Sequence, residues 1–411
     1  MGRIILHCDL NNFYASCECM LDPAIRDKPV AVCGSVEARQ GIVLAKNYIA
    51  KGYGVETAEP VWQALSKCPS LVIVPPHFDL YIKYSKAVKQ IYSDYTERVE
   101  SFGLDECWLD VSGKRIGEKE GYLIAEEIRE RVKREVGLTI SVGVSFNKIF
   151  AKLGSDMKKP DAVTVISEKH FREQIWGLPA HYMMGVGRKT KKLLDKYNID
   201  TIGKIACTPE SFFENRIGKV GVQLRKNANG EDTSPVLESE QYLPAKSVGH
   251  GMTTPKDLTT YDEVWFLMLD LVQDIGKNLR ANHQKALGVS ISVRNRKLEN
   301  KQWQCKLPIP TGSPMNIAKA AYELFLASYN WKEPIRAVTV SAIDLVPEET
   351  PTQLDFFSST ERFERIEKMN ECAWRVRDRF GFDSIMPASL LINKRCNVNY
   401  INNFASRAVM Q

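Results

Sequence analysis

The feature that most constrains this chain is an acidic pair between two hydrophobic runs, in the stretch ERVESFGLDECWLDVS at residues 97–112. β-forming residues lead up to Gly103, and a second hydrophobic run follows Asp105 and Glu106. This pattern predicts a hairpin with two carboxylates at its tip. Adjacent carboxylates repel each other, so the pair suggests a bound divalent cation. A solvated turn is the alternative, because turns favour such residues.

A third carboxylate, that of Asp9, favours a bound cation over a solvated turn. Asp9 stands where a predicted strand, residues 4–8, runs into a predicted helix that starts near Phe13. The alternative role for Asp9 is to cap that helix. If the strands lie side by side, Asp9, Asp105 and Glu106 converge, and three carboxylates can hold two Mg²⁺ about 4 Å apart for phosphoryl transfer. Oxygen ligands without His or Cys favour Mg²⁺, or Mn²⁺ as an alternative, over Zn²⁺.

Four motifs, in this order and spacing, resemble those of the Y-family translesion DNA polymerases: DLNNFYASCE, AKNYIAKGYGV, SFGLDECWLD and GVSFNKIFAKLGSDMKKP. The first motif and the lysine in AKGYGV are nearer to the catalytic subunit of bacterial polymerase V than to polymerase IV. The resemblance implies an error-prone, DNA-directed DNA polymerase of DNA damage tolerance and the SOS response. Such an enzyme uses two Mg²⁺ to transfer a nucleotide from a dNTP to a primer 3′-hydroxyl, with Asp9, Asp105 and Glu106 as its catalytic, metal-binding carboxylates.

The resemblance also implies a steric gate and a roof over the nascent base pair. Tyr14, with Phe13 beside it, is the gate, since a ring under the sugar leaves no room for a ribose 2′-hydroxyl. Ile42 and Leu44 form the roof. Because these two side chains are larger than the small residues of some relatives, we expect a tighter roof that tolerates bulky template adducts poorly.

Three residues are implied to bind the triphosphate: Tyr48, Lys51 and Lys159. Tyr48 and Lys51 lie three apart on one helical face, so both can reach the same ligand. In most relatives the second position is Arg, which grips phosphate in two places, whereas Lys is a point charge. After Pro160, relatives often have Asn-Gly where this chain has Asp161 and Ala162.

The predicted elements indicate an α+β fold and a multidomain right-hand polymerase. Helices alternating with strands around the acidic hairpin predict the palm. Later, alternating hydrophobic residues from Leu287 to Val293, with helices on either side, predict a βαββαβ unit. We expect a palm at residues 1–168 with a small finger insertion at 22–74, a helix-hairpin-helix thumb at 169–230, a linker at 231–244, a little finger at 245–346 and a C-terminal tail at 347–411.

Two basic segments are predicted to contact the DNA backbone. In the thumb, a Gly-Val-Gly turn lets backbone amides approach phosphate, and a strongly basic helix follows it. In the little finger, basic side chains concentrate between residues 276 and 306, although a charge run is commonly only a solvated face. The residues predicted to make these contacts are Gly185, Gly187, Arg188, Lys189, Arg294 and Arg296.

The tail carries a short motif, PEETPTQLDFF. Apolar anchors in an extended segment are how peptides fill grooves, so this motif predicts a sliding-clamp peptide. Its anchors would be Gln353, Leu354, Phe356 and Phe357. A docking turn for the helix predicted at residues 360–380 is the alternative.

Composition fits a protein that works on nucleic acid outside membranes. The net charge of +6 and the hydrophobic fraction of 44% are ordinary. No hydrophobic run reaches the roughly 20 residues of a membrane helix. The 10 cysteines form no CxxC pair, which predicts reduced, largely buried thiols. We expect a cytoplasmic, nucleoid-associated protein whose partners are primer-template DNA, dNTPs and the sliding clamp; accessory subunits stay open.

Two other classes of function use some of the same features. A non-catalytic DNA-repair or clamp-associated scaffold needs only the basic thumb and sheet. A palm-domain nucleotidyl cyclase-like enzyme needs the carboxylates and metals, but no duplex-binding domains. Retention of all three carboxylates weakens the first alternative, and tight duplex binding would weaken the second.

Overall fold

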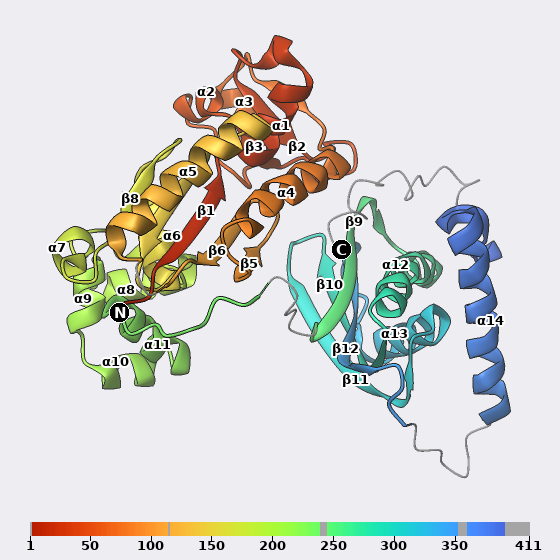
Figure 1. Ribbon diagram of the computed structural model, residues 1–411. Helices are drawn as coiled ribbons and strands as arrows, with labels where there is room; N and C mark the ends of the chain where they lie inside the picture. The colour runs from red at the N-terminus through yellow and green to blue at the C-terminus, as the bar shows by residue number, and fades with distance from the viewer. Residues whose placement is uncertain (1, 114–115, 239–244, 352–359, 391–411) are drawn as a thin grey trace. The chain divides into compact units, whose positions relative to one another are not determined.

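The computed structural model describes residues 2–113, 116–238, 245–351 and 360–390 (Figure 1). It divides into two compact units, residues 1–34 with 42–242 and residues 35–41 with 243–411. Each unit mixes helices and sheets, so the predicted α+β class is confirmed.

A five-stranded sheet forms the centre of the first unit. Its strand order is β5-β6-β1-β7-β8, and only β7 and β8 run parallel to each other. Helices α4 and α5 cover one face of this sheet and α6 covers the other (Figure 1). The bounds of these elements are β1 (Ile5–Leu10), β5 (Val99–Phe102), β6 (Glu106–Asp110), β7 (Ile140–Ser145), β8 (Val163–Val165), α4 (Phe78–Ser93), α5 (Glu118–Val136) and α6 (Lys148–Met157).

The acidic hairpin is present, with two corrections. Asp105 lies in the turn, where Gly103 has a φ of +86°, but Glu106 is the first residue of β6 rather than part of the tip. Asp9 lies inside β1 rather than at its end, because the N–H of Leu10 still donates to the carbonyl of Asp105 at 3.0 Å. Asn12, not Asp9, is the N-cap of the next helix. The alternative role of Asp9 as a helix cap is therefore wrong.

Helix α6 lies very close to the central sheet. A Cβ added at Gly143 of β7 would stand 1.9 Å from the carbonyl oxygen of Ala151 and 2.5 Å from the backbone N of Ser155. Backbone thus packs against backbone, and only glycine fits. The helix starts at its cap Asn147, whose side chain accepts a hydrogen bond from the N–H of Phe150 at 2.8 Å. This close packing fixes where the polar side chains of α6 meet the sheet.

A smaller sheet of three strands, ordered β3-β2-β4, follows the first helix. Its buried face packs Val43 against Ala31 and Ala64. Helices α2 and α3 belong to the same part of the chain. The bounds are α1 (Phe13–Leu21), η1 (Pro23–Ile25), β2 (Val30–Cys33), β3 (Val43–Lys46), α2 (Tyr48–Gly52), α3 (Val61–Lys67) and β4 (Val72–Val74).

A group of short helices completes the first unit. Its hydrophobic core includes Phe150 and Leu153 of α6, so this group packs on the helix that covers the central sheet. Residues 231–238 then run without helix or strand, yet Val236 is buried with Ile5 and Trp108. The helices are α7 (Phe171–Ile175), η2 (Ala180–Tyr182), α8 (Arg188–Lys196), α9 (Ile202–Cys207), α10 (Glu210–Arg216) and α11 (Lys219–Ala228).

The second unit confirms the βαββαβ plan. Its antiparallel sheet has the order β11-β10-β12-β9, and α12 and α13 cover one face (Figure 1). Thr260 caps α12 in a reciprocal capping box with Glu263. The bounds are β9 (Ser247–Leu258), α12 (Tyr261–Ala281), β10 (Gln284–Asn295), β11 (Asn300–Thr311), α13 (Pro314–Ser328) and β12 (Ile335–Pro347).

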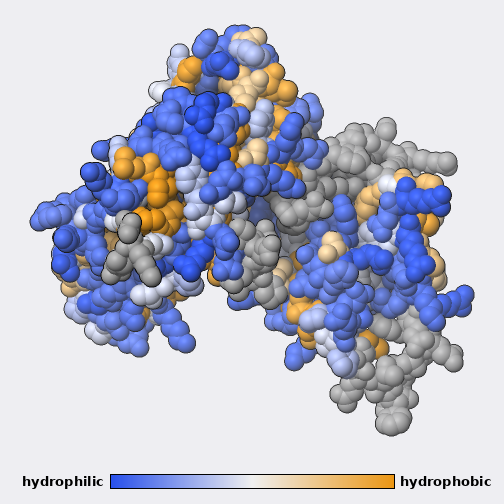
Figure 2. Space-filling model, in the orientation of Figure 1, coloured by the Kyte–Doolittle hydropathy of each residue, from blue (hydrophilic) through white to orange (hydrophobic). Residues whose placement is uncertain are grey.

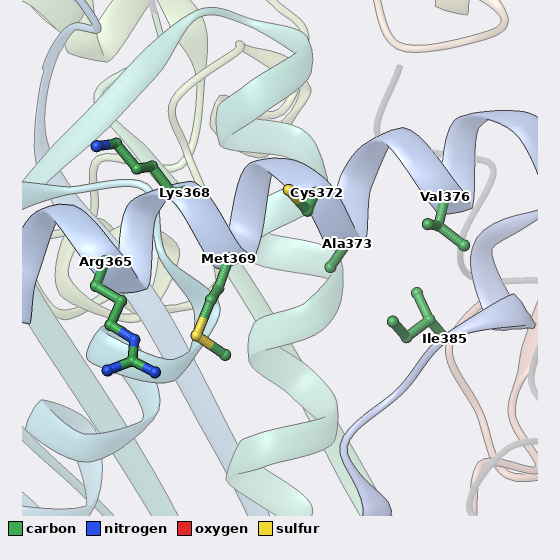
Figure 3. A pocket seen from close by; sticks show the side chains of 7 residues that line it. All are labelled: Arg365, Lys368, Met369, Cys372, Ala373, Val376 and Ile385. Atoms are coloured by element: carbon green, nitrogen blue, oxygen red, sulfur yellow. The ribbon is translucent and has the colours of Figure 1, made fainter.

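Helix α14 (Thr360–Phe380) and the short η3 (Phe382–Ser384) add to this unit. The inner side of α14 combines polar contacts, in which Asn370 bonds Ser313 and Arg377 donates to Gln273, with the buried ring of Trp374. Other side chains of the helix line a hollow that Figure 3 shows from close by. The lining residues are Arg365, Lys368, Met369, Cys372, Ala373, Val376 and Ile385.

The surface visible in Figure 2 is mostly hydrophilic, with hydrophobic side chains in small patches. None of the helices described here is both long and apolar enough to span a bilayer. Across the described ranges, six cysteines are buried and all are free, as predicted for reduced thiols. Cys8 and Cys33 are among the buried ones.

Candidate active site

Strand pairing brings the three predicted carboxylates together. In the ladder between β1 and β6, Asp9 stands directly opposite Glu106, and the carbonyl of Asp105 accepts from the N–H after Asp9. Directly opposed residues of an antiparallel pair point to the same face. We call Asp9, Asp105 and Glu106 the acidic cluster. It lies where β1 ends and β6 begins, next to the hairpin turn that joins β5 to β6.

Two lysines neutralise much of this charge. Lys152 of α6 places its ammonium 2.9 Å from Glu106 Oε2 and 3.3 Å from Asp9 Oδ2. Lys159, just after α6, lies 2.8 Å from the same Asp9 oxygen and 2.8 Å from Asp156. Asp9 is only 5% exposed. Burying that carboxylate without such partners would be costly.

The members of the cluster differ in proton affinity. Burial, followed by the charges of Asp9 and Glu106, raises the pKa of Asp105 to about 6. Burial alone would also raise the pKa of Glu106, but the His7 ring and the Lys152 ammonium, 3.1 Å and 2.9 Å away, lower it to about 2. Of the three carboxylates, that of Asp105 therefore has the negative charge that neighbouring positive groups compensate least.

The donor chemistry of the cluster suits a hard cation. Its ligands are carboxylate oxygens alone, which favour Mg²⁺ or Mn²⁺, and added positive charge would relieve the repulsion that raises the pKa of Asp105. Within the described ranges, however, no three His, Cys, Asp or Glu side chains meet at metal-ligand distances. The ammonium groups of Lys152 and Lys159 compensate the carboxylates instead. A cation would have to displace them.

Only one of the two aromatic residues predicted for the gate is near the cluster. Phe13 is 3% exposed and packs in the hydrophobic core. The half-buried ring of Tyr14 stacks on Tyr81, with centroids 4.3 Å apart and an interplanar angle of 11°. Burial raises the pKa of Tyr14, and the charge of Asp105 raises it further, so its hydroxyl lies within the field of the cluster.

Two of the three residues predicted to bind the triphosphate, Tyr48 and Lys159, lie near the Asp9 carboxylate. Asn47 caps α2 and also accepts from the N–H of Val30 at 3.1 Å, which ties the helix to β2. Burial raises the pKa of the Tyr48 hydroxyl, and the charges of Lys159 and Asp9 act on it in opposite directions. The ammonium of Lys51 lies 5.6 Å from the centroid of the Tyr48 ring.

The predicted roof residues flank a buried side chain. Val43 is fully buried, whereas Ile42 is 41% exposed and Leu44 is partly buried. Ile42 forms an isolated bridge with Pro60. The alternation of the strand thus turns Ile42 and Leu44 away from the hydrophobic core that holds Val43.

The residues predicted to contact DNA are exposed in their own units. Gly185 has a φ of +94°, and a Cβ added there or at Gly187 would meet open space. Arg188 and Lys189 are exposed at the start of α8. In the second unit, Arg294 is exposed near the end of β10, and the exposed side chain of Arg296 lies 3.8 Å from Asp257. The clamp-peptide residues Gln353, Leu354, Phe356 and Phe357 lie outside the described residues.

Two residues at the site had no predicted role. His7 lies between Glu106 and Ser155 on the cluster's face of β1. Asp161 pairs with Arg129 and Lys133 of α5, each at 2.8 Å, and its N–H donates to Asn11 Oδ1 at 2.9 Å. Strand alternation could have placed His7 beside Asp9, but no local pattern gives the partners of Asp161.

Comparison with known proteins is consistent over both units. The model of the impB/mucB/samB family matches residues 8–156, and that of the family's C-terminal domain matches residues 245–356. DNA polymerase IV of Acetivibrio thermocellus is 51% identical over 397 residues, which cover 97% of this chain and 100% of the relative. DNA polymerase IV 1 of Bacillus subtilis is 36% identical over 393 residues, covering 95% and 94%.

A solved structure shares the fold. It is a Y-family DNA polymerase chimera of Dbh and Dpo4, with a TM-score of 0.75 and 22% identity, covering 84% of this chain and 99% of that one. The relatives reported above are both named polymerase IV. They give no support to the nearer resemblance to polymerase V that the first motif and Lys51 suggested.

Proposed function

This chain belongs to the impB/mucB/samB family of Y-family translesion DNA polymerases, and from that premise we propose that the acidic cluster is its catalytic centre. The protein is a DNA-directed DNA polymerase of the translesion type. Family membership does not favour a non-catalytic scaffold or a cyclase-like enzyme. Asp9, Asp105 and Glu106 would act where the primer 3′-hydroxyl meets the dNTP.

Divalent metal ions take part in catalysis in this family. We propose that two Mg²⁺ bind here, with Asp9 and Asp105 as ligands to both and Glu106 as a further ligand to one. When bound, such ions lower the pKa of the attacking hydroxyl and neutralise the triphosphate. The observation that supports this is the raised pKa of Asp105, which is caused by burial and then by the charges of the other two carboxylates.

Two lysines and a tyrosine of this chain would hold the triphosphate of the dNTP. Tyr48, Lys51 and Lys159 would bind the triphosphate, with Lys159 exchanging the carboxylate of Asp9 for a phosphate oxygen. If a metal cation takes the place of the Lys159 ammonium beside Asp9, the Asp9 carboxylate keeps a positive partner during this exchange. The proximity of Tyr48 to Lys159 and Asp9 supports this role.

Tyr14 would exclude ribonucleotides, whereas Phe13 would only support it from the core. Ile42 and Leu44 would close over the nascent base pair and limit bulky adducts. Bypass of a bulky template adduct should then improve in an Ile42→Ala, Leu44→Ala double variant.

For partners, we propose primer-template DNA held through the basic thumb and sheet, dNTPs, and a sliding clamp bound through Gln353, Leu354, Phe356 and Phe357. The polymerase would act in the SOS response, in the cytoplasm at the nucleoid.

One observation carries the proposal: the register that sets Asp9 opposite Glu106, with Asp105 hydrogen-bonded beside them. The test is primer extension with Mg²⁺ and each dNTP, comparing the intact chain with Asp105→Ala. We expect template-directed extension that falls at least about 10³-fold in the variant while duplex binding survives. Equal extension by both proteins would refute the assignment.

A further inference from the structure

A buried carboxylate joins the helix that carries Tyr14 to helix α4. Glu18 lies four residues after Tyr14, so both side chains project from the same side of α1. Glu18 is 3% exposed. The hydroxyl of Tyr81 donates to its Oε1, and Nδ1 of His77 lies 3.0 Å from both of its carboxylate oxygens. His77 is the N-cap of α4 and Tyr81 lies one turn later, so Glu18 connects α1 to the start of α4.

The same turn of α4 supplies the aromatic neighbours of Tyr14. Tyr81 stacks on the Tyr14 ring at 4.3 Å between centroids, and Phe78 meets that ring edge-on at 5.9 Å. Tyr81 is fully buried. Its ring is therefore fixed on one face by the stack and at its hydroxyl end by the bond to Glu18. The place of the Tyr14 ring depends on Tyr81, and the place of Tyr81 depends on Glu18.

A carboxylate is a costly acceptor to bury for this purpose. Among the residues that the structure describes, His77 is the one basic side chain within ion-pair distance of Glu18, and it is half exposed. A buried charge with so little compensation costs stability, whereas a neutral amide would also accept from the hydroxyl. The carboxylate adds strength, because hydrogen bonds to an ionised acceptor are shorter and stronger. Burial and then the bond to Glu18 raise the pKa of Tyr81, so its hydroxyl keeps the proton that it donates.

We propose that Glu18 is a positioning residue for the gate: by holding Tyr81 and the first turn of α4, it fixes the ring of Tyr14 where that ring excludes a ribose 2′-hydroxyl. This inference rests on the proposed function, since it applies only if Tyr14 is the gate. A gate discriminates by a clash with one hydroxyl group, so a ring that is free to move would admit ribonucleotides while deoxynucleotides still bind. Glu18 would thus act on the choice of sugar rather than on the chemical step.

Single-nucleotide insertion with a dNTP and the matching rNTP tests this role. Tyr81→Phe keeps the stacked ring but removes the bond to Glu18. Its ratio of kcat/KM for the dNTP to kcat/KM for the rNTP should fall about fivefold, through a lower KM for the rNTP, while kcat/KM for the dNTP stays nearly unchanged. A loss of folding alone would instead lower the activity toward both nucleotides together.

Tyr92→Phe is the matched control. Tyr92 lies on the same helix and is 1% exposed, and in the described part of the chain the rings that contact Tyr14 are those of Phe13, Phe78 and Tyr81. Tyr92→Phe therefore also removes a buried hydroxyl from α4, and it should discriminate between the sugars as the wild type does. Equal discrimination in Tyr81→Phe and Tyr92→Phe would overturn the proposal.

A double-variant cycle then tests whether the two side chains act through one bond. Glu18→Gln keeps the shape of Glu18 without its charge, and it should lower the discrimination about threefold, because an amide oxygen still accepts from Tyr81. The double variant should be no more permissive than Tyr81→Phe alone. Losses that add in the double variant would contradict a shared bond. If circular dichroism shows that Glu18→Gln does not fold, the comparison of Tyr81→Phe with Tyr92→Phe still decides.

The Tyr14→Ala variant separates this role from the proposed function. If Tyr14→Ala admits ribonucleotides while Tyr81→Phe behaves like Tyr92→Phe, Tyr14 is the gate and the positioning role of Glu18 is wrong. If Tyr14→Ala discriminates between the sugars as the wild type does, the assignment of the gate itself fails, and the positioning role fails with it.

Discussion

At the scale of single residues, Asp105 stands out because the protein compensates its charge least. Lys152 and Lys159 contact the other two carboxylates, while Asp105 has its pKa raised to about 6. In the metal-free protein Asp105 therefore binds more protons in the folded chain than in the unfolded chain between about pH 4 and pH 6. The contribution of Asp105 to stability should fall as the pH rises through that window.

Asp105→Asn removes this titration. Below about pH 4 the variant and the wild type should unfold at similar denaturant concentrations, since both side chains are neutral. Above pH 6 the variant should be more stable by about 1–2 kcal/mol, a value reduced for the partial solvent exposure of Asp105. Urea unfolding at a series of pH values, in the presence of a chelator, measures the difference. A constant difference across the series would contradict the expectation.

The neighbouring aromatics allow a second test at this scale. Tyr14→Ala should raise ribonucleotide incorporation by at least about tenfold, because the ring proposed to close the sugar pocket is lost. Tyr14→Phe keeps the ring and serves as the control. Phe13→Ala should instead cost about 3–4 kcal/mol of unfolding free energy, as expected for a buried ring. Single-nucleotide insertion assays and denaturant unfolding separate these effects; equal ribonucleotide discrimination in Tyr14→Ala and Tyr14→Phe would exclude the gate.

The sequence reveals some site residues more readily than others. Asp9, Asp105 and Glu106 were predictable as a cluster because each interrupts a hydrophobic run, although a turn and a helix cap were alternative uses for these charges. His7 was not, since one histidine inside a buried strand resembles an ordinary core residue. Its proximity to Glu106 depends on the register between β1 and β6, which are about a hundred residues apart in sequence. Strand register is a property of tertiary structure.

At the scale of elements, most helices and strands were predictable to within a few residues. Helix α6 starts at its cap Asn147, and α12 begins at its capping box at Thr260, both readable from local sequence. The predicted end of β1 and the predicted start of β6 were wrong. The ladder between these strands includes Asp9 in β1 and already begins at Glu106 in β6. Ladder hydrogen bonds, not local propensity, set those limits.

The loop after α6 leads to a prediction for an element. It carries Lys159, and its far end is anchored by the ion pairs of Asp161 with Arg129 and Lys133. Asp161→Ala should release the loop and raise KM for dNTP by about fivefold, while kcat changes little. Because these pairs are partly exposed, the loss of unfolding free energy should be about 1 kcal/mol.

The control for this prediction lies on α5 itself. Glu135→Ala removes an ion pair with Arg131 that does not contact the loop. It should leave KM for dNTP as in the wild type. Steady-state insertion kinetics measure both variants, and equal KM values in Asp161→Ala and Glu135→Ala would show that the anchor has no part in substrate binding.

At the scale of the whole molecule, binding to duplex DNA should depend strongly on salt. Arginines that contact phosphate release counterions, so each lost contact should lower the slope of log K against log salt by about 1. Arg294→Ala should weaken binding and reduce the slope. Arg296→Ala should have a smaller effect, because Asp257 already lies 3.8 Å from its side chain. Fluorescence anisotropy at several salt concentrations gives the slopes; slopes unchanged in both variants would contradict the assignment of this surface.

The contact between β7 and α6 has a consequence for how this protein can diverge. At Gly143 any side chain would collide with the backbone of the helix that carries Lys152 and Ser155. The geometry of the proposed catalytic centre therefore depends on a position that has no functional group of its own. In a library of random variants selected for polymerisation, position 143 should accept glycine alone, while exposed positions of the same helix accept many residues. Glycine would thus be retained at position 143 because the backbone of α6 leaves no space for a side chain there.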